Sequence, residues 1–165
     1  MNKKKLIVIG ALIIFAFSII RMVANIGGSQ NASAIDKYYD KDLKGLGVED
    51  SLSGAIDKLT EASKEYESAA AEGKPVDWTI LEPKFNDAIK EMEAKKAEIE
   101  ALNIEDEKVK EINSYLISSY DGMIKGYKQL VQGMKEGNNE MIRSADETLR
   151  KAQDDIGKWQ TMMNE

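Results

Sequence analysis

Hydrophobic residues recur at helical spacing along most of the chain and predict four long helices. The pattern is most regular at about 140–164, where every third or fourth residue is apolar and one stripe forms along one face. The residues of this stripe are Ile142, Ala145, Leu149, Ala152, Ile156, Trp159 and Met163. Similar stripes predict helices at about 50–72, 78–102 and 105–136. Four amphipathic helices with short connections are typical of an all-α, antiparallel up-down-up-down four-helix bundle.

The third predicted helix, about 105–136, carries two adjacent apolar lines and therefore a wide hydrophobic face. We expect this face to pack either on residues 35–43 or on a second copy of the chain. The same helix contains Gly122, Gly126 and Gly133, although a glycine inside a helix costs about 1 kcal/mol relative to alanine. These glycines predict the close approach of a neighbouring helix, and a groove or flexible point is the alternative.

Residues that cap helices stand near the predicted ends. Short polar side chains can accept hydrogen bonds from the N–H groups of a first helical turn, and the candidates are Asp50 or Ser51, Asp77, and Asn138 or Asn139. Gly73 and Gly137 follow the first and third helices, where a left-handed residue commonly ends a helix. Pro83 predicts that the second helix is kinked in its first turn or begins its regular part near Glu82.

The polar face of the fourth helix places acidic residues four positions before basic ones. Such pairs stabilise an exposed helix by about 0.2–0.5 kcal/mol each. The expected pairs are Asp146–Arg150, Glu147–Lys151 and Asp154–Lys158. They indicate a solvated face.

The N-terminus has a different pattern, in which Lys3, Lys4 and Lys5 precede the uncharged, largely apolar segment Leu6–Ile20. A basic start before an apolar segment is typical of export signals. A spanning helix needs about 20 residues, and the segment reaches that length when it continues past Arg21 to Ile26. Because lysines favour the cytoplasmic side, residues 1–26 are predicted to be a signal-anchor or signal peptide that places the following chain outside the cytoplasm.

Two fates of this N-terminal segment are open. Ala32-Ser33-Ala34 has the small residues that cleavage requires but lies far beyond the apolar segment. We therefore expect an uncleaved, single-pass membrane anchor, and the alternative is a secreted or periplasmic protein cleaved near Ala34. Residues 27–47 are predicted to be a flexible juxtamembrane linker with a possible short helix at 35–44, and residues 48–165 are predicted to be the bundle.

The amino-acid composition limits the chemistry that the chain can perform. The sequence contains no histidine and no cysteine, which excludes imidazole bases, thiolate nucleophiles and the metal sites built from these residues. The net charge of −6 disfavours nucleic acid as a partner. Several carboxylates lie close to lysines in the second predicted helix and are interpreted as a solvated face, with a cation site or an acid/base pair as the alternative. The acidic residues are Glu91, Glu93, Glu98 and Glu100, and the lysines are Lys90, Lys95 and Lys96. We expect no catalytic residue, no metal and no cofactor.

Aromatic residues are the remaining candidates for a binding or interaction site. Tyr120 and Tyr127 lie on one line of the third helix with Tyr115 nearby, so these rings could border a small-molecule pocket between helices. Trp78 and Trp159 lie near helix ends, where an indole can cover the core while its N–H stays hydrated. The alternative for all five is packing in the core.

These observations predict a non-enzymatic, membrane-anchored extracytoplasmic bundle that acts as an envelope scaffold or protein-interaction module. Its expected partners are the lipid bilayer, through the N-terminal segment, and either another protein or a second copy of the chain. The alternative is an extracytoplasmic bundle that binds or senses a small molecule or cation. The layout looks like that of small bacterial envelope proteins and of the outer part of helical-bundle chemoreceptors, a resemblance of architecture without a shared motif.

Overall fold

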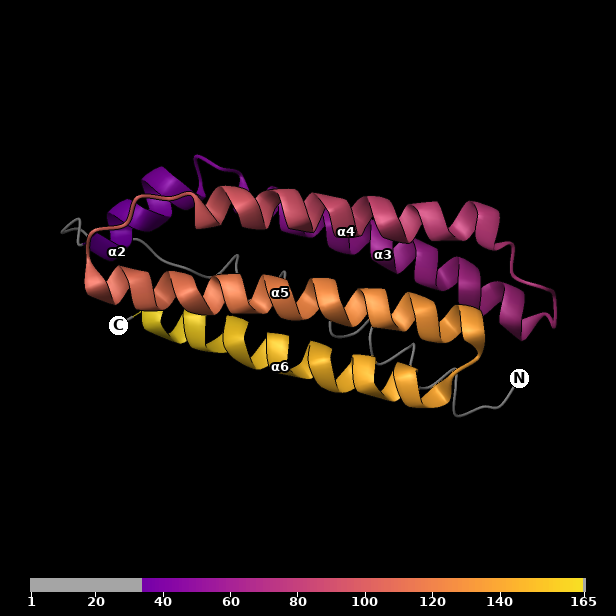
Figure 1. Cartoon of the computed structure of the whole chain (residues 1–165). Coiled ribbons are helices and arrows are strands. Elements are labelled where there is room, and N and C mark those ends of the chain that lie inside the picture. Colours follow the sequence, from indigo (N-terminus) through magenta and orange to yellow (C-terminus); the bar gives the residue numbers. More distant parts are fainter. Residues whose placement is uncertain (1–33, 165) are drawn as a thin grey trace.

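Four long antiparallel helices make up most of the structure. The computed structural model describes residues 34–164, in which all regular structure is helical. The long helices are α3 (Val48–Ala71), α4 (Trp78–Glu100), α5 (Glu107–Glu136) and α6 (Asn139–Met163). The α3–α4 hairpin lies against the α5–α6 hairpin (Figure 1). The prediction of an all-helical, bundle-like chain is confirmed, and the predicted helix ends agree to within about two residues.

The predicted signal or membrane helix at residues 1–26 lies outside the described residues. Ala34 is the first residue that the structure describes. From there to residue 164, no helix combines the length and the apolar character that crossing a bilayer requires.

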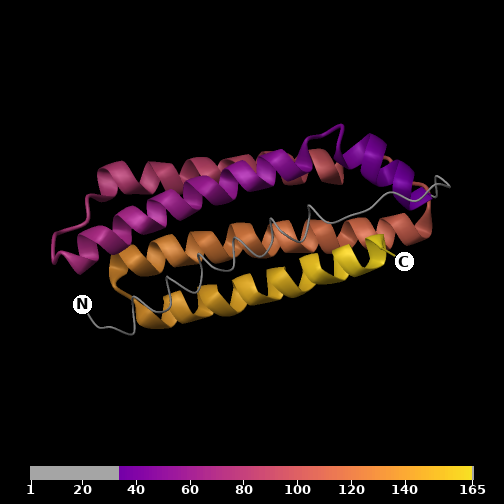
Figure 2. The ribbon, with the colours of Figure 1, turned by 180° about the vertical axis from the view of Figure 1, so that it is seen from behind.

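The segment before α3 folds onto one end of the bundle. The short helix α2 (Ala34–Lys37) continues into one stretch of π-helix, η1 (Tyr38–Leu43). Tyr38 and Leu43 are each only 2 % exposed, and the Tyr38 hydroxyl donates a 2.7 Å hydrogen bond to Oδ1 of Asn113 in α5. Figure 2 shows α2 at the same end of the molecule as the C-terminus of α6. Residues 38–43 therefore belong to the core and contact α5 through Tyr38 and Asn113. The helices that pack most extensively on α5 are α6 and α4, so the expectation that its wide face packs on residues 35–43 or on a second copy holds only for this one contact.

Tyr38→Phe is expected to lower the free energy of unfolding by about 1–3 kcal/mol, because buried Asn113 loses its hydrogen-bond donor. Urea unfolding of the full-length chain measures this loss. Tyr39→Phe is the matched control, since the Tyr39 hydroxyl donates to Glu49, which is only partly buried and can be hydrated. Equal losses in the two variants would contradict the role given to the Tyr38–Asn113 bond.

Side-chain caps begin three of the long helices. Asp77 accepts a 3.0 Å hydrogen bond from the backbone N–H of Thr79, and Asn138 accepts from two first-turn N–H groups of α6 at 3.1 Å. Asp106 accepts from the N–H of Val109 at 3.0 Å and begins α5. The predicted caps Asp77 and Asn138 are thus confirmed.

The start of α3 differs from the prediction. Gly47 has a φ of +61° and is the residue that precedes the helix, so Asp50 lies inside the first turn and does not cap it. Glycine adopts this left-handed conformation without steric cost. The negative charge of Asp50, in the first turn, interacts favourably with the positive end of the helix dipole. The helix α4 begins at Trp78 and continues through Pro83, so the prediction that its regular part begins near Glu82 is wrong.

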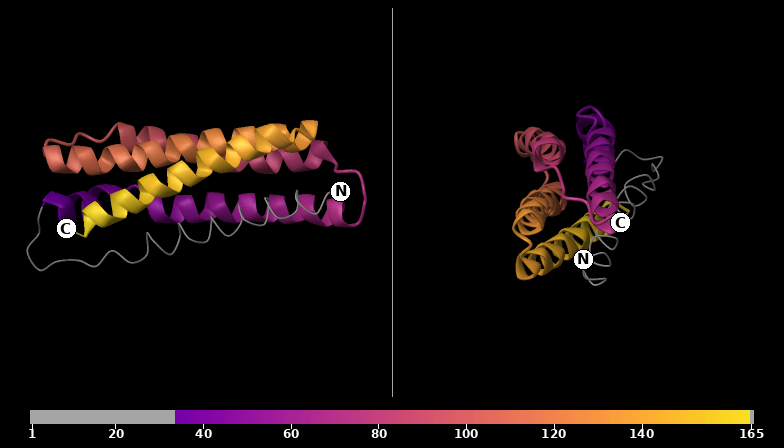
Figure 3. Two further views of the ribbon diagram at one scale, coloured as in Figure 1. Left: turned by 90° about the horizontal axis from the view of Figure 1, so that it is seen from below. Right: turned by 90° about the vertical axis from the view of Figure 1, so that its right-hand side faces the viewer.

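Three glycines of α5 have no side chain and so allow α6 to pack close to this helix. A methyl group on Gly126 would lie 2.6 Å from Cγ of Leu149, and one on Gly122 would lie 2.8 Å from Cβ of Ala152. Gly133 is similarly close to Ile142. These distances leave no room for a side chain, so the predicted close approach of a neighbouring helix is confirmed. Figure 3 shows α6 crossing obliquely toward the end that carries α2 and η1.

Ion pairs join α4 to both neighbouring helices along the rim of the core. Lys135 of α5 lies 2.7 Å from Glu82, and Lys96 lies 2.9 Å from Asp121 of α5. The carboxylates of the segment 91–100 are paired with lysines: Glu91 with Lys58, Glu93 with Lys128, Glu98 with Lys95, and Glu100 with Lys96. The interpretation of this face as solvated is therefore confirmed, and exposed pairs of this kind contribute about 0–1 kcal/mol each.

Candidate functional site

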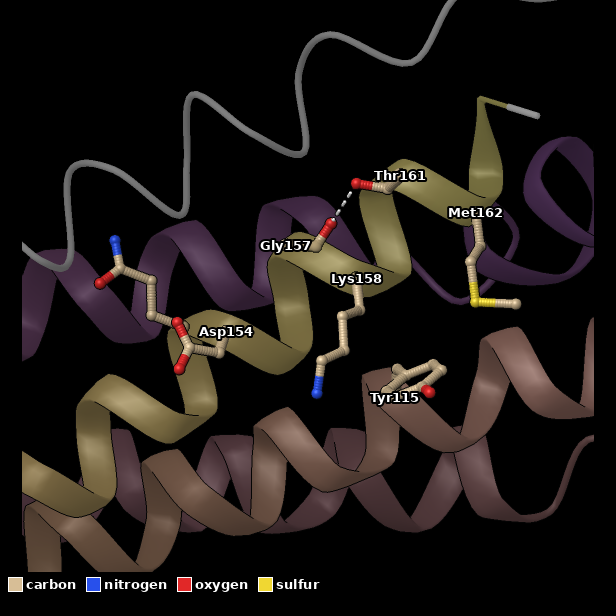
Figure 4. Close-up of a pocket in the computed structure, with 7 residues that line it drawn as sticks. Tyr115, Asp154, Gly157, Lys158, Thr161 and Met162 are labelled. Carbon is tan, nitrogen blue, oxygen red and sulfur yellow. Dashed lines mark hydrogen bonds between the residues drawn. The ribbon is translucent and has the colours of Figure 1, made fainter.

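The candidate site is an open groove of about 700 Å³ between α5 and α6, near the end of the bundle that carries α2 and η1 (Figure 4). Tyr115 of α5 forms one wall. All other lining residues belong to α6 and are spaced three or four positions apart, so they share one face of that helix. They are Gln153, Asp154, Gly157, Lys158, Thr161 and Met162. The groove is open along one side, so it suits a convex surface better than an enclosed ligand.

The polar contacts of the groove centre on Lys158. Its ammonium lies 5.3 Å from the ring centroid of Tyr115, a cation–π distance. The same ammonium pairs with Asp155 at 3.3 Å, and Asp155 also accepts a 2.7 Å hydrogen bond from Ser118 of α5. These contacts hold Lys158 over the groove and connect the two helices at its edge.

The pairing of Lys158 with Asp155 differs from the prediction that Asp154 would be its partner. Asp154 is exposed on the rim of the groove and forms no ion pair with the residues at positions 34–164. Of the other predicted pairs, Asp146–Arg150 is present at 2.9 Å. Asp154 thus presents an exposed carboxylate on the rim of the groove.

Gly157 lines the groove. A methyl group there would meet no atom of residues 34–164 within 4 Å, in contrast to the tightly covered glycines of α5. A glycine in the middle of a helix costs about 1 kcal/mol relative to alanine. The sequence signal was available, since α6 is otherwise regular, but Gly157 was not identified as a candidate.

The structure separates the five aromatic residues that the sequence indicated. Tyr120, Tyr127 and Trp159 are 0 %, 3 % and 1 % exposed, which places them in the core and not in the groove. Trp78 packs against Tyr66 with ring centroids 5.8 Å apart, at the opposite end of the bundle (Figure 1). Tyr115 alone of the five lines the groove. The five rings therefore do not share one pocket.

The core contains several polar groups without hydrogen-bond partners among the described residues. The Tyr120 hydroxyl, the Ser119 hydroxyl and Nε1 of Trp159 are buried and unpaired. Nε1 of Trp159 lies near the Tyr38 hydroxyl and acts to lower the pKa of Tyr38. The two groups do not meet hydrogen-bond geometry. Among residues 34–164, no group of three or more acidic side chains is arranged to hold a metal ion.

Burial raises the pKa of Tyr38, Tyr120 and Tyr127 well above the ordinary value, because a phenolate cannot be hydrated in the core. In each case desolvation is the largest cause, and the acidic side chains Asp42 and Glu98 add to the shift at Tyr38 and Tyr120 respectively. These hydroxyls are therefore protonated, which excludes them as bases at neutral pH.

The raised tyrosine pKa values predict loss of stability in alkaline solution. Unfolded tyrosines ionise near pH 10 while the buried ones stay protonated, so the unfolded state is favoured as the pH rises above about 10. Below that pH the tyrosines do not affect the folding equilibrium. Thermal unfolding of the full-length chain across about pH 8–11 should show this decrease, and the decrease should be smaller in Tyr127→Phe. If the stability of Tyr127→Phe fell with pH as steeply as that of the unchanged chain, the raised pKa given to Tyr127 would be contradicted.

Comparison with protein-family models finds no match to this chain. Comparisons with characterised proteins and with solved structures likewise find none. The function must therefore be argued from the chain's own residues.

Proposed function

We propose that this chain is a non-enzymatic envelope protein, anchored in a membrane by residues 1–26, whose helical bundle provides a surface for protein contacts outside the cytoplasm. The observation that carries the proposal is the segment Leu6–Ile26 behind Lys3, Lys4 and Lys5. Such a segment favours export with the N-terminus retained in the cytoplasm. Periplasmic or extracellular release after cleavage near Ala34 is the alternative fate.

The position of the bundle relative to the lipid follows from the length of the linker. Residues 27–33 can span at most about 25 Å when fully extended. Because Tyr38 and Leu43 are fixed in the core, the end of the bundle with α2 and η1 would lie close to the membrane. The groove beside Tyr115 lies at this same end, so it would be presented near the bilayer surface.

The contact function, as opposed to catalysis, is supported by the residue types in the groove. The groove offers one lysine, one unpaired carboxylate and an aromatic wall, with no histidine or cysteine anywhere in the chain. General acid–base or nucleophilic catalysis needs a group with a matched pKa and a positioned partner. The open shape and the mixed charge of the groove suit reversible protein contact.

Cell fractionation combined with intact-mass measurement tests the anchor. The expected result is a full-length chain in the membrane fraction whose bundle is digested when protease is added to spheroplasts. A mature chain beginning near Ile35 in the periplasm or medium would support export with cleavage. A full-length chain that is soluble in the cytosol would refute the proposal, and a cytoplasmic protein in the same samples controls for lysis.

A further inference from the structure

The capping segment, formed by α2 and η1, is attached to the bundle through side chains more than through its backbone. Within residues 34–164, its backbone comes close to the long helices at only a few points, whereas neighbouring long helices are in extensive contact. Three side chains of η1 supply the attachment, since Tyr38, Tyr39 and Leu43 are each no more than 9 % exposed. A segment held by few contacts is typical of units that open without global unfolding.

The turn after η1 provides a hinge for this segment. Lys95 of α4 donates a 2.6 Å hydrogen bond to the carbonyl of Leu46 and holds the chain at that point. Gly45 directly precedes it, and hinges are often small residues that absorb a change in backbone angles. The capping segment can therefore turn away before Leu46 without disturbing α3.

The backbone of η1 has the wide turn of a π-helix. The N–H of Lys44 donates to the carbonyl of Tyr39, five residues earlier, at 3.0 Å. Such turns are rare, and they occur frequently at functional sites. The unusual turn thus coincides with the part of the described chain that is attached most sparsely.

The closed capping segment leaves one buried donor without a partner. Trp159 is 1 % exposed, and its Nε1 has no hydrogen-bond partner among the described residues although the Tyr38 hydroxyl is near. A buried N–H group that makes no hydrogen bond costs free energy, and water satisfies it once the segment opens. The closed state is therefore less stable than its apolar contacts alone would make it.

From these observations we infer that the capping segment opens as one unit about Gly45 while the four long helices stay folded, and that this opening uncovers Trp159. Tyr38 leaves Asn113 in this movement, because the hydroxyl of Tyr38 donates to that residue only in the closed state. The proposed function places this end of the bundle beside the bilayer, where an indole with a free N–H is favoured. The opening itself does not depend on the anchoring, so the two can be tested separately.

Hydrogen exchange of the full-length chain in detergent tests the opening. The amide of Lys44, which closes the π-helical turn, should exchange at least about a hundredfold faster than the amide of Met123 in α5. Urea below the unfolding transition should accelerate exchange steeply at Met123 and little at Lys44, because opening a short segment exposes little surface. Equal rates with equal urea dependence would show that the segment unfolds only with the bundle, and the inference would be overturned.

Fluorescence of Trp159 tests whether the opening uncovers it. Trp78→Phe leaves Trp159 as the only tryptophan of the chain. In that background, Tyr38→Ala removes the largest buried side chain of the capping segment and should bring acrylamide quenching of Trp159 close to that of the unfolded chain. Circular dichroism should show that the long helices are kept.

Tyr66→Ala in the same background is the matched control, since Tyr66 is a buried tyrosine at the other end of the bundle, and quenching of Trp159 should stay low there. Low quenching in Tyr38→Ala, or a rise in quenching that is accompanied by loss of the long helices, would overturn the inference. A chain whose capping segment opens as described but which fractionates with the cytosol would refute the anchoring and leave the opening intact.

Discussion

Trp159→Ala is expected to lower the free energy of unfolding by about 3–5 kcal/mol, the range found for removal of large buried aromatic residues. Trp159 is 1 % exposed and is among the largest fully buried side chains of the described chain. Its indole lies near the Tyr38 hydroxyl, where η1 meets α5 and α6. The substitution would therefore open a cavity at the point where three elements join.

Urea unfolding of the full-length chain, followed by circular dichroism, measures this loss. Trp78→Ala is the matched control, since Trp78 is only partly buried and contacts Tyr66 at the other end of the bundle. We expect a clearly smaller loss in that variant. Faster hydrogen exchange in residues 38–43 of Trp159→Ala would show that the capping segment has loosened. Equal losses in the two variants would contradict the central role of Trp159.

The helices were predictable because the information that defines them is local. The apolar stripe of α6, from Ile142 to Met163, is buried as its spacing predicts. Asp77 and Asn138 cap the helices that follow them. The start of α3 was predicted less well, since capping by a left-handed glycine at Gly47 leaves no polar side chain as a signal. Local chemistry therefore defines an element more clearly than it defines the element's first residue.

The groove was not predictable because it depends on how α5 and α6 cross. Spacing alone places Tyr115 near Tyr120 and Tyr127, yet the crossing leaves Tyr115 beside Lys158 and buries the other two rings. In the same way, i,i+4 spacing favoured Asp154 as the partner of Lys158, while the structure pairs Lys158 with Asp155, which Ser118 of α5 holds in place. Contacts between helices override these short-range preferences.

The three glycines inside α5 were predicted to mark a close helix contact, and the structure confirms that α6 covers all three. Gly122, Gly126 and Gly133 predicted a close helix neighbour without indicating which helix it is. The structure identifies this neighbour as α6 and shows that the contact at Gly122 involves Ala152, including its backbone. Backbone atoms cannot move aside as a flexible side chain can, so the contact at Gly122 gives the sharpest test of this packing.

Gly122→Ala is expected to destabilise the chain although alanine favours a helix. The added methyl group would lie 2.8 Å from Cβ and 3.3 Å from Cα of Ala152, so α6 must shift as a whole. Such overpacking costs about 1–3 kcal/mol, and we expect it to exceed the gain of up to about 1 kcal/mol from helix propensity. Gly54→Ala meets no atom within 4 Å and should instead stabilise the chain by about 0.5–1 kcal/mol.

A double-mutant cycle separates packing from propensity. Ala152→Gly removes the methyl group that Gly122→Ala would meet, so the double variant should be more stable than the sum of the two single changes predicts. Because the two residues touch directly, a coupling of about 0.5–3 kcal/mol is expected. Urea unfolding of the four chains gives the coupling energy. Additive effects, or stabilisation by Gly122→Ala alone, would show that α5 and α6 are not held together through this glycine.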